Sequence, residues 1–166
     1  MTYGYYCSNR SKKEDIVVGV YFPKRYIPGA GIILNQKIYY GTQHFAGEMK
    51  RLPVAIPWEQ LNYDDEEEVF KELKTILEIF GCTFAPAKFI LYGDFFTLSL
   101  IKKLKEFTQN FFGQSFCINI EITENIEKDY ETGMISLVLE KLKQKIEDLE
   151  ENLNESEGKN ACRASV

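Results

Sequence analysis

The sequence has few of the residues that mark disulfide-rich or metal-binding proteins. Its 166 residues include four cysteines, one histidine and one tryptophan. The cysteines are Cys7, Cys82, Cys117 and Cys162. They form no Cys-x-x-Cys pair and have no histidine pair at zinc-ligand spacing, so neither a metal site nor a disulfide framework is expected. Scattered cysteines of this kind are typical of a reducing compartment, and we predict a cytoplasmic protein.

Long apolar runs and an excess of positive charge are also missing. No stretch reaches the roughly 18 apolar residues that a membrane-spanning helix needs, and the polar start has no signal-peptide core. We therefore expect no membrane partner. The formal net charge is −5, from 25 acidic and 20 basic residues. A nucleic-acid-binding surface needs clustered Lys and Arg, so we expect no direct contact between this segment and nucleic acid.

The sequence does contain enough apolar material for one ordinary core. Hydrophobic residues make up 45% of the chain and aromatic residues 14%. A chain of this length and composition is typical of one domain. We predict a flexible N-terminal segment over residues 1–13, a folded lobe over residues 14–147, and a helix extension with a disordered tail over residues 148–166.

The pattern of apolar residues predicts five strands and three helices. The predicted strands are Ile16–Phe22, Gly29–Leu34, Gln36–Tyr40, Phe89–Tyr92 and Cys117–Ile122. The predicted helices are Asn62–Phe80, stopped by Gly81, then Leu98–Phe111, and a last one from about Tyr130 into the 150s. Asn35 and Gln36 predict a tight hairpin turn. The order β-β-β-α-β-α-β-α, with right-handed crossovers, predicts an α/β fold with a five-stranded mixed sheet. This order matches the ribonuclease H-like (actin-like ATPase) domain.

Three stretches carry a resemblance to the ROK family of repressors and sugar kinases. Ile32–Glu48, IILNQKIYYGTQHFAGE, resembles the family segment that runs from a glycine-rich turn through a hairpin into an Ala-Gly-Glu motif. Pro86–Gly93 resembles the family's proline-led strand that ends in glycine, and Gly133–Ile135 resembles its final Gly-Ala helix. The resemblance covers residues 14–147 and corresponds to the C-terminal half of the family. The family's Asp-x-Gly phosphate loop and catalytic aspartate belong to its first lobe, so no catalytic residue is expected here and no activity from this chain alone.

The sequence departs from the family pattern where the chemistry needs particular residues. The family's phosphate-facing turn, Gly-Thr-Gly-Ile-Gly-x-Gly, corresponds to Arg25–Gly31, which keeps only Gly29 and Gly31 of its glycines. The family's Ala-Gly-Glu-Ile-Gly-His corresponds to Ala46–Arg51, so an arginine replaces the histidine. The Gly-Gly near the adenosine reads Gly93-Asp94 here, and the cysteine-rich zinc loop is absent.

The resemblance implies a sugar site and a weaker nucleotide site. Glu48 would accept hydrogen bonds from sugar hydroxyls, with Arg51 in place of the histidine donor and with His44 and Gly47 beside it. The alternative is that Glu48 pairs with a neighbouring cation on a wet surface, and that the lone His44 packs on an aromatic ring. The implied nucleotide contacts are Gly29, Gly31 and Gly93, for which the alternative is a tight turn.

The last predicted helix carries a second apolar pattern. Ile135, Leu139, Leu142, Ile146, Leu149 and Leu153 recur at intervals of 4, 3, 4, 3 and 4. This is the a/d rhythm of a coiled-coil seam, and it predicts a homo-oligomer. The alternative is an ordinary amphipathic helix surface.

Three functional hypotheses follow. The first is a non-catalytic sugar-sensing and oligomerising lobe of a ROK-type transcriptional regulator, with a sugar as ligand and no cofactor. The second is the second lobe of a ROK sugar kinase, which would bind a hexose, ATP and Mg²⁺ only together with a first lobe. The third is a structural dimerisation module.

Overall fold

The centre of the chain is a mixed β-sheet. The computed structural model describes residues 1–9, 16–24, 26–113, 116 and 118–163, without the side chains of residues 151–163. Its strands are β1 (Ile16–Tyr21), β2 (Gly29–Leu34), β3 (Lys37–Ile38), β4 (Lys88–Tyr92) and β5 (Asn119–Thr123). Within these residues they form one five-stranded sheet in the order β3-β2-β1-β4-β5. Strand β1 pairs antiparallel with β2 and parallel with β4, which pairs parallel with β5. The predicted five-stranded mixed sheet is confirmed.

The predicted hairpin turn joins β2 to β3. Asn35 and Gln36 have positive φ angles of 50° and 67°, and Leu34 pairs with Lys37 across them. Two consecutive residues with positive φ match the right-handed twist of the flanking strands, which is why such turns are favoured in hairpins. Strand β3 is shorter than predicted at both ends, because Gln36 belongs to the turn and the strand ends at Ile38.

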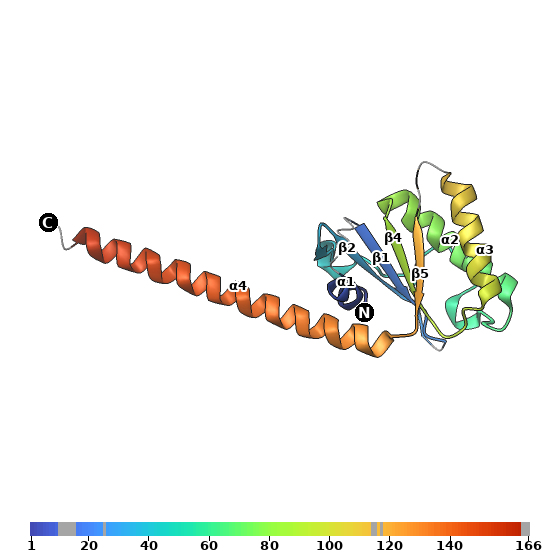
Figure 1. Cartoon of the computed structure of the whole chain (residues 1–166), viewed down its shortest axis with the longest axis horizontal. Coiled ribbons are helices and arrows are strands. Elements are labelled where there is room, and N and C mark those ends of the chain that lie inside the picture. The colour runs from blue at the N-terminus through green and yellow to red at the C-terminus, as the bar shows by residue number, and fades with distance from the viewer. Residues whose placement is uncertain (10–15, 25, 114–115, 117, 164–166) are drawn as a thin grey trace.

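Helices α2 (Glu66–Phe84) and α3 (Leu98–Phe112) cover one face of the sheet (Figure 1). The side chain of Asp65 caps α2 by accepting hydrogen bonds from the amides of Glu67 and Glu68. The helix was predicted to stop at Gly81. It continues to Phe84 and is capped by Ala85, which has a φ of 45°. Gly81 stays helical because the Phe112 ring of α3 packs against it, where a Cβ would lie 2.2 Å from the ring.

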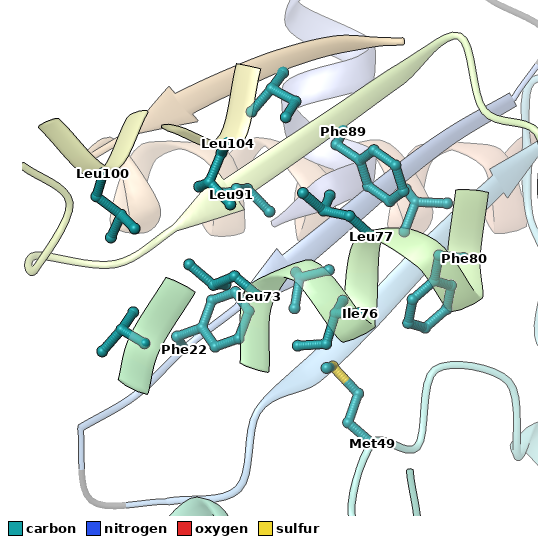
Figure 2. Close-up of a cluster of buried hydrophobic side chains, with 14 of the residues drawn as sticks. Phe22, Met49, Leu73, Ile76, Leu77, Phe80, Phe89, Leu91, Leu100 and Leu104 are labelled. Carbon is teal, nitrogen blue, oxygen red and sulfur yellow. The ribbon is translucent and has the colours of Figure 1, made fainter. Parts of the chain in front are cut away.

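The larger core lies between these two helices and the sheet (Figure 2). It includes Phe22, Met49, Leu73, Ile76, Leu77, Phe80, Phe89, Leu91, Leu100 and Leu104. Alternate residues of β4 enter opposite sides of the sheet: Phe89 and Leu91 belong to this core, whereas Ile90 and Tyr92 belong to a second cluster. Strand β4 is therefore buried on both faces, which gives its apolar sequence pattern.

Helix α1 (Thr2–Ser8) packs on the other face of the sheet, so the prediction of a flexible segment over residues 1–13 is wrong for these residues. Residues 10–13 lie outside the described part of the chain. Gly19 and Gly31 are paired on neighbouring strands. A Cβ added to Gly19 would lie 2.2 Å from the Thr2 hydroxyl oxygen, and one added to Gly31 would lie 2.6 Å from it. Two adjacent glycines thus leave a hollow in the sheet surface that Thr2 fills.

Helix α4 (Ile126–Arg163) begins beside α1 and then runs away from the sheet and its other helices (Figure 1). It starts four residues before the predicted position, and its backbone stays helical to Arg163, beyond the predicted end in the 150s. Residues 148–163 are therefore helical, where a helix extension followed by a disordered tail was predicted. Residues 164–166 lie outside the described part. None of the helices among the described residues combines the length and apolarity needed to cross a bilayer.

Candidate functional site

The residues of the predicted sugar site lie in the connection between β3 and α2, residues 39–65. This connection is anchored at Met49, whose side chain is 1% exposed and belongs to the larger core. The indole nitrogen of the buried Trp58 donates a hydrogen bond to the Met49 carbonyl at 3.2 Å. The connection is thereby packed against α2.

Glu72 holds the same connection from inside α2. Its side chain is buried, and its carboxylate accepts hydrogen bonds from the amides of Ala55 at 3.1 Å and Ile56 at 3.2 Å. A buried carboxylate needs such donors, because leaving water without them costs several kcal/mol. The two bonds fix the path of the backbone over the first half of α2.

Ala46-Gly47-Glu48 lies alongside the start of β2. The Gly47 carbonyl accepts a hydrogen bond from the Ala30 amide at 2.9 Å, and Glu48 forms an isolated antiparallel bridge with Gly29. Gly47 has a φ of 90°, and a Cβ there would lie 1.9 Å from the Ala30 carbonyl oxygen. Only glycine fits this close approach. Gly47 therefore shapes the backbone that positions Glu48.

A cavity of about 570 Å³, broadly open to solvent, lies between this segment and the C-terminal end of α2. Its lining includes Glu48, Tyr39, Phe45, Leu52, Phe80 and Phe84, with the polar Thr42, Gln43 and Thr83. Small-molecule sites have this size, mostly apolar and aromatic walls, and a few polar groups that orient the ligand. Tyr39 and the residues of α2 were not part of the predicted site, because only the folded chain brings them beside Glu48.

The structure brings together two of the four predicted sugar-site residues. Glu48 and Gly47 line the cavity, whereas His44 and Arg51 do not. His44 is exposed, and its ring packs against Tyr40 with 5.0 Å between ring centroids. Arg51 is exposed beyond the buried Met49.

The three glycines of the predicted nucleotide site lie apart from this cavity. Gly29 and Gly31 lie within β2, and not in a turn. They line a separate cavity of about 340 Å³ beneath α1 and α4, and Gly93 is not among its lining residues. Gly93 follows β4, where an added Cβ would lie 2.7 Å from the Phe95 ring. The Thr2 side chain therefore lies against Gly31, where the family pattern requires backbone open to phosphate, and the Phe95 ring lies against Gly93, where the family pattern has a glycine near the adenosine.

A further cavity, of about 370 Å³, lies near the carboxyl ends of β1 and β4. Ligands of α/β proteins bind at such edges of parallel strands. Lys24 and Asp94 in its wall form an ion pair at 3.3 Å. The Tyr63 hydroxyl is buried there without a hydrogen-bond partner among the described residues, and burial raises its pKa. The prediction missed this cavity, because its residues are far apart in sequence.

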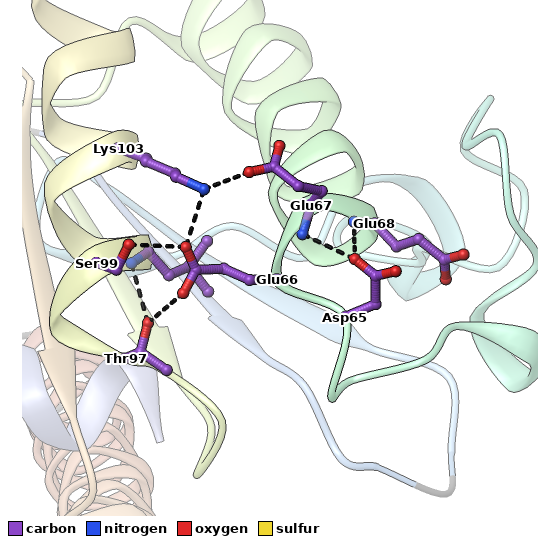
Figure 3. Close-up of polar contacts among 8 residues, drawn as sticks. Asp65, Glu66, Glu67, Glu68, Thr97, Ser99 and Lys103 are labelled. Atoms are coloured by element: carbon purple, nitrogen blue, oxygen red, sulfur yellow. Dashed lines mark hydrogen bonds and ion pairs between the residues drawn. The ribbon is translucent and has the colours of Figure 1, made fainter.

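Glu66 in the same wall joins α2 to α3 (Figure 3). Its carboxylate accepts hydrogen bonds from the hydroxyls of Thr97 at 2.7 Å and Ser99 at 2.8 Å, and Lys103 lies 2.9 Å away. The Thr97 hydrogen bond, with those from Lys103 and Ser99, lowers the pKa of Glu66 to about 2. A carboxylate with this pKa is a poor general base, so Glu66 serves to join the helices.

A second polar cluster is buried beneath α1. The buried Lys88 lies 3.2 Å from the Glu121 carboxylate and donates to the Tyr5 hydroxyl at 3.3 Å. The Tyr92 hydroxyl donates to Asp129 at 3.0 Å. Burial, followed by a hydrogen bond to Glu121, raises the pKa of Tyr5 to about 12, and burial also raises the pKa of Asp129. These contacts tie α1 and the start of α4 to β4 and β5.

Among the described residues, no group of three or more His, Cys, Asp or Glu side chains is placed to hold a metal.

No protein-family model and no curated protein sequence matches this chain. Solved structures do. A ROK hexokinase from Thermus thermophilus superposes with a TM-score of 0.61 at 10% identity, over 80% of this chain and 60% of the hexokinase. The chain has the fold of ROK proteins. A ROK family glucokinase from Streptomyces griseus, in complex with glucose and AMPPNP, gives a TM-score of 0.60 at 14% identity, over 81% of this chain and 64% of its own.

A third ROK structure agrees. A ROK family protein from Streptococcus pneumoniae TIGR4, in complex with sucrose, gives a TM-score of 0.59 at 11% identity, over 84% of this chain and 63% of that protein. The predicted ROK resemblance and the actin-like α/β fold are confirmed at the level of the fold. The chain spans less than two thirds of each of these ROK structures, between 60% and 64%.

Proposed function

We propose that this chain is a non-catalytic, sugar-binding lobe of a ROK-type transcriptional regulator, with the sugar in the cavity beside Glu48. One observation carries the proposal: Glu48 of the Ala-Gly-Glu motif is among the residues that line a cavity of about 570 Å³ whose other walls are mainly apolar and aromatic. The glucose and sucrose in two of the similar ROK structures support a sugar as the ligand class.

The chemistry of the cavity suits a sugar. An ionised carboxylate accepts hydrogen bonds from adjacent hydroxyl groups, and such charge-assisted bonds are about twice as strong as neutral ones. Tyr39 and Phe45 offer aromatic surface for the apolar C–H faces of a pyranose ring. Glu48 is therefore assigned as the orienting group, and Gly47 as the residue that positions its backbone.

The non-catalytic part of the proposal rests on the glycine positions. Thr2 packs on Gly31 and Phe95 on Gly93, so these backbones do not fit a nucleotide phosphate or adenosine as they stand. The family's Asp-x-Gly loop and catalytic aspartate lie outside the stretch that resembles the family. No phosphoryl-transfer step is therefore assigned to residues of this chain.

Calorimetry with a panel of glucose, N-acetylmannosamine and sucrose tests the proposal. We expect binding of one sugar by the unmodified chain and its loss in Glu48→Ala. Glu59→Ala is the matched control, because Glu59 is an exposed carboxylate in the same connection and does not line the cavity. No heat with any sugar, or equal binding by Glu48→Ala, contradicts the proposed site.

The alternative is the second lobe of a ROK sugar kinase, which the kinase names of several similar structures favour. An ATP-dependent phosphorylation assay distinguishes the two, run on this chain with and without the first lobe of a ROK kinase. The proposal predicts no product in either case. Product formed with the added lobe supports the kinase alternative, and product formed by this chain alone contradicts the non-catalytic assignment.

A further inference from the structure

We infer that α4 pairs with α4 of a second copy of this chain as a parallel, in-register, two-stranded coiled coil. The inference does not depend on sugar binding. Its starting point is the 38-residue length of α4, most of which extends away from the sheet (Figure 1). At 1.5 Å per residue the helix is roughly 57 Å long, far more than is needed to cover the sheet.

Only one side of α4 contacts the rest of its own chain. Gly133 is buried against α1, Leu137 packs into the cluster beneath α1, and Glu140 accepts a hydrogen bond from the Tyr3 hydroxyl. Every residue from 138 to 150 is exposed. A helix advances about 100° per residue, so residues 133, 137 and 140 share one side of α4.

An apolar stripe follows the opposite side. It consists of Ile135, Leu139, Leu142, Ile146 and Leu149, whose exposed fractions lie between 51% and 62%. Leu153 continues the same spacing in the sequence. Together these five large apolar side chains, each more than half exposed, form one continuous apolar surface along the helix, and soluble proteins normally cover a surface of this kind. We call these five residues the α4 seam.

The spacing of the seam identifies the kind of partner. Intervals of 4, 3, 4 and 3 average 3.5 residues, the repeat that keeps one apolar face against another helix over several turns. In heptad notation Leu139 and Ile146 occupy a positions, and Ile135, Leu142 and Leu149 occupy d positions. The heptad around Ile146, with a β-branched residue at a and leucine at both neighbouring d positions, is the pattern that favours two parallel strands. A second α4 supplies the same seam and therefore covers it completely.

The charges beside the seam determine the orientation. Lys145 is at a g position and Glu150 is at the next e position. In a parallel, in-register pair each Lys145 faces Glu150 of the other copy, which gives two attractive contacts. In an antiparallel pair, g positions face g positions and e positions face e positions. Lys145 then no longer faces Glu150, so both attractive contacts are lost. Both folded bodies then lie at the same end of the pair.

The mass of the full chain in solution tests the pairing. We expect sedimentation equilibrium to give a dimer for the unmodified chain and a monomer for Leu142→Asp. The seam residues are half-exposed, so this substitution leaves the fold intact, and an unchanged thermal midpoint of the β-sheet region checks that it does. Gln144→Asp, in the same helix turn but on the side of α4 that faces the β2–β3 hairpin and away from the seam, is the matched control and stays dimeric. A monomeric unmodified chain, or a dimeric Leu142→Asp, overturns the inference.

Charge exchange tests the orientation. Lys145→Glu and Glu150→Lys each place like charges together in a parallel homodimer, and each is expected to weaken it about tenfold. An equimolar mixture of the two variants restores both attractive contacts, so heterodimers form preferentially. Lys141→Glu, at a c position that lies beside the β2–β3 hairpin and off the seam, carries the same change in charge as Lys145→Glu and leaves the dimer unchanged. Failure of the mixture to form heterodimers excludes the parallel register. Because no sugar is present, a negative result leaves the sugar-binding proposal untouched.

Discussion

Gly4 of α1 and Gly133 of α4 meet where the two helices cross. A Cβ added to Gly133 would lie 3.0 Å from the Gly4 nitrogen, and one added to Gly4 would lie 1.6 Å from the carbonyl oxygen of Asp129. Missing side chains at both positions allow the two backbones to touch. This contact holds the N-terminal helix in place between α4 and the sheet.

Gly4→Ala is expected to lower the free energy of unfolding by about 2 kcal/mol, because the added methyl group forces the helices apart. Helix propensity alone would raise the free energy of unfolding by about 0.5–1 kcal/mol, because alanine favours a helix more than glycine does. The sign of the change, measured by urea unfolding, therefore distinguishes the packing effect from the propensity effect. Gly29→Ala is the control, since its Cβ meets nothing within 4 Å. Equal stability of the two variants contradicts the close crossing.

Glu72→Ala leaves the amides of Ala55 and Ile56 without their acceptor. We expect a loss of about 2–4 kcal/mol in unfolding free energy, from two unpaired donors beside the core. Amide hydrogen exchange should accelerate at both positions. Exposed Glu59 in the same connection provides the control, and Glu59→Ala should change neither quantity. Unchanged exchange in Glu72→Ala would show that the carboxylate does not hold the connection.

The depressed pKa of Glu66 predicts an acid-sensitive contact between α2 and α3. Its folded pKa of about 2 lies below the ordinary value of 4.5, so ionised Glu66 stabilises the fold above about pH 4.5. This contribution is lost as the pH falls towards about 2. Urea unfolding of Glu66→Gln at about pH 6 and about pH 3 should show a smaller difference between the two pH values than the unmodified chain. Glu68→Gln, in the same turn of α2, should not reduce it.

Lys88→Met removes the cation from the cluster beneath α1. Glu121 and the Tyr5 hydroxyl then lose a charged hydrogen-bond partner, and we expect about 2 kcal/mol lower stability in urea unfolding. Lys102→Met is the control, because the Lys102 side chain is 79% exposed and forms an ion pair with Glu106 on its own helix. A neutral effect of Lys88→Met would mean that the methionine packs as well as the ion pair.

The sheet and its two covering helices could be predicted because their signals are local. The β-branched run Ile16–Tyr21 and the Asn35-Gln36 turn each specify their conformation within a few residues. The end of α2 could not be predicted in this way. Gly81 reads as a helix stop, but the distant Phe112 packs against it and the helix continues.

The N-terminal helix was missed for a related reason. Residues 1–13 carry no long apolar period, and nothing in them shows that Gly19 and Gly31 pair across two strands to receive Thr2. That hollow exists only in the assembled sheet. A short segment can therefore be ordered by a surface that lies elsewhere in the sequence.

The Ala-Gly-Glu motif grouped Gly47 and Glu48, and both line the cavity, because adjacent residues share the local backbone path. Their role in sugar binding stays a prediction. Arg51 and His44 were grouped with them by proximity in sequence alone. Met49 is buried between Glu48 and Arg51, Arg51 is not among the residues that line the cavity, and His44 packs on Tyr40. The aromatic walls from α2 come from the tertiary fold.

The position of Trp58 gives this protein a built-in optical reporter. It is the only tryptophan in the sequence, is 3% exposed, and bonds to the backbone next to Glu48 through the Met49 carbonyl. Its emission therefore comes from one place, the contact between the β3–α2 connection and the core. A ligand that shifts this connection changes the Trp58 fluorescence without any label, whereas pairing at the far end of α4 does not change it.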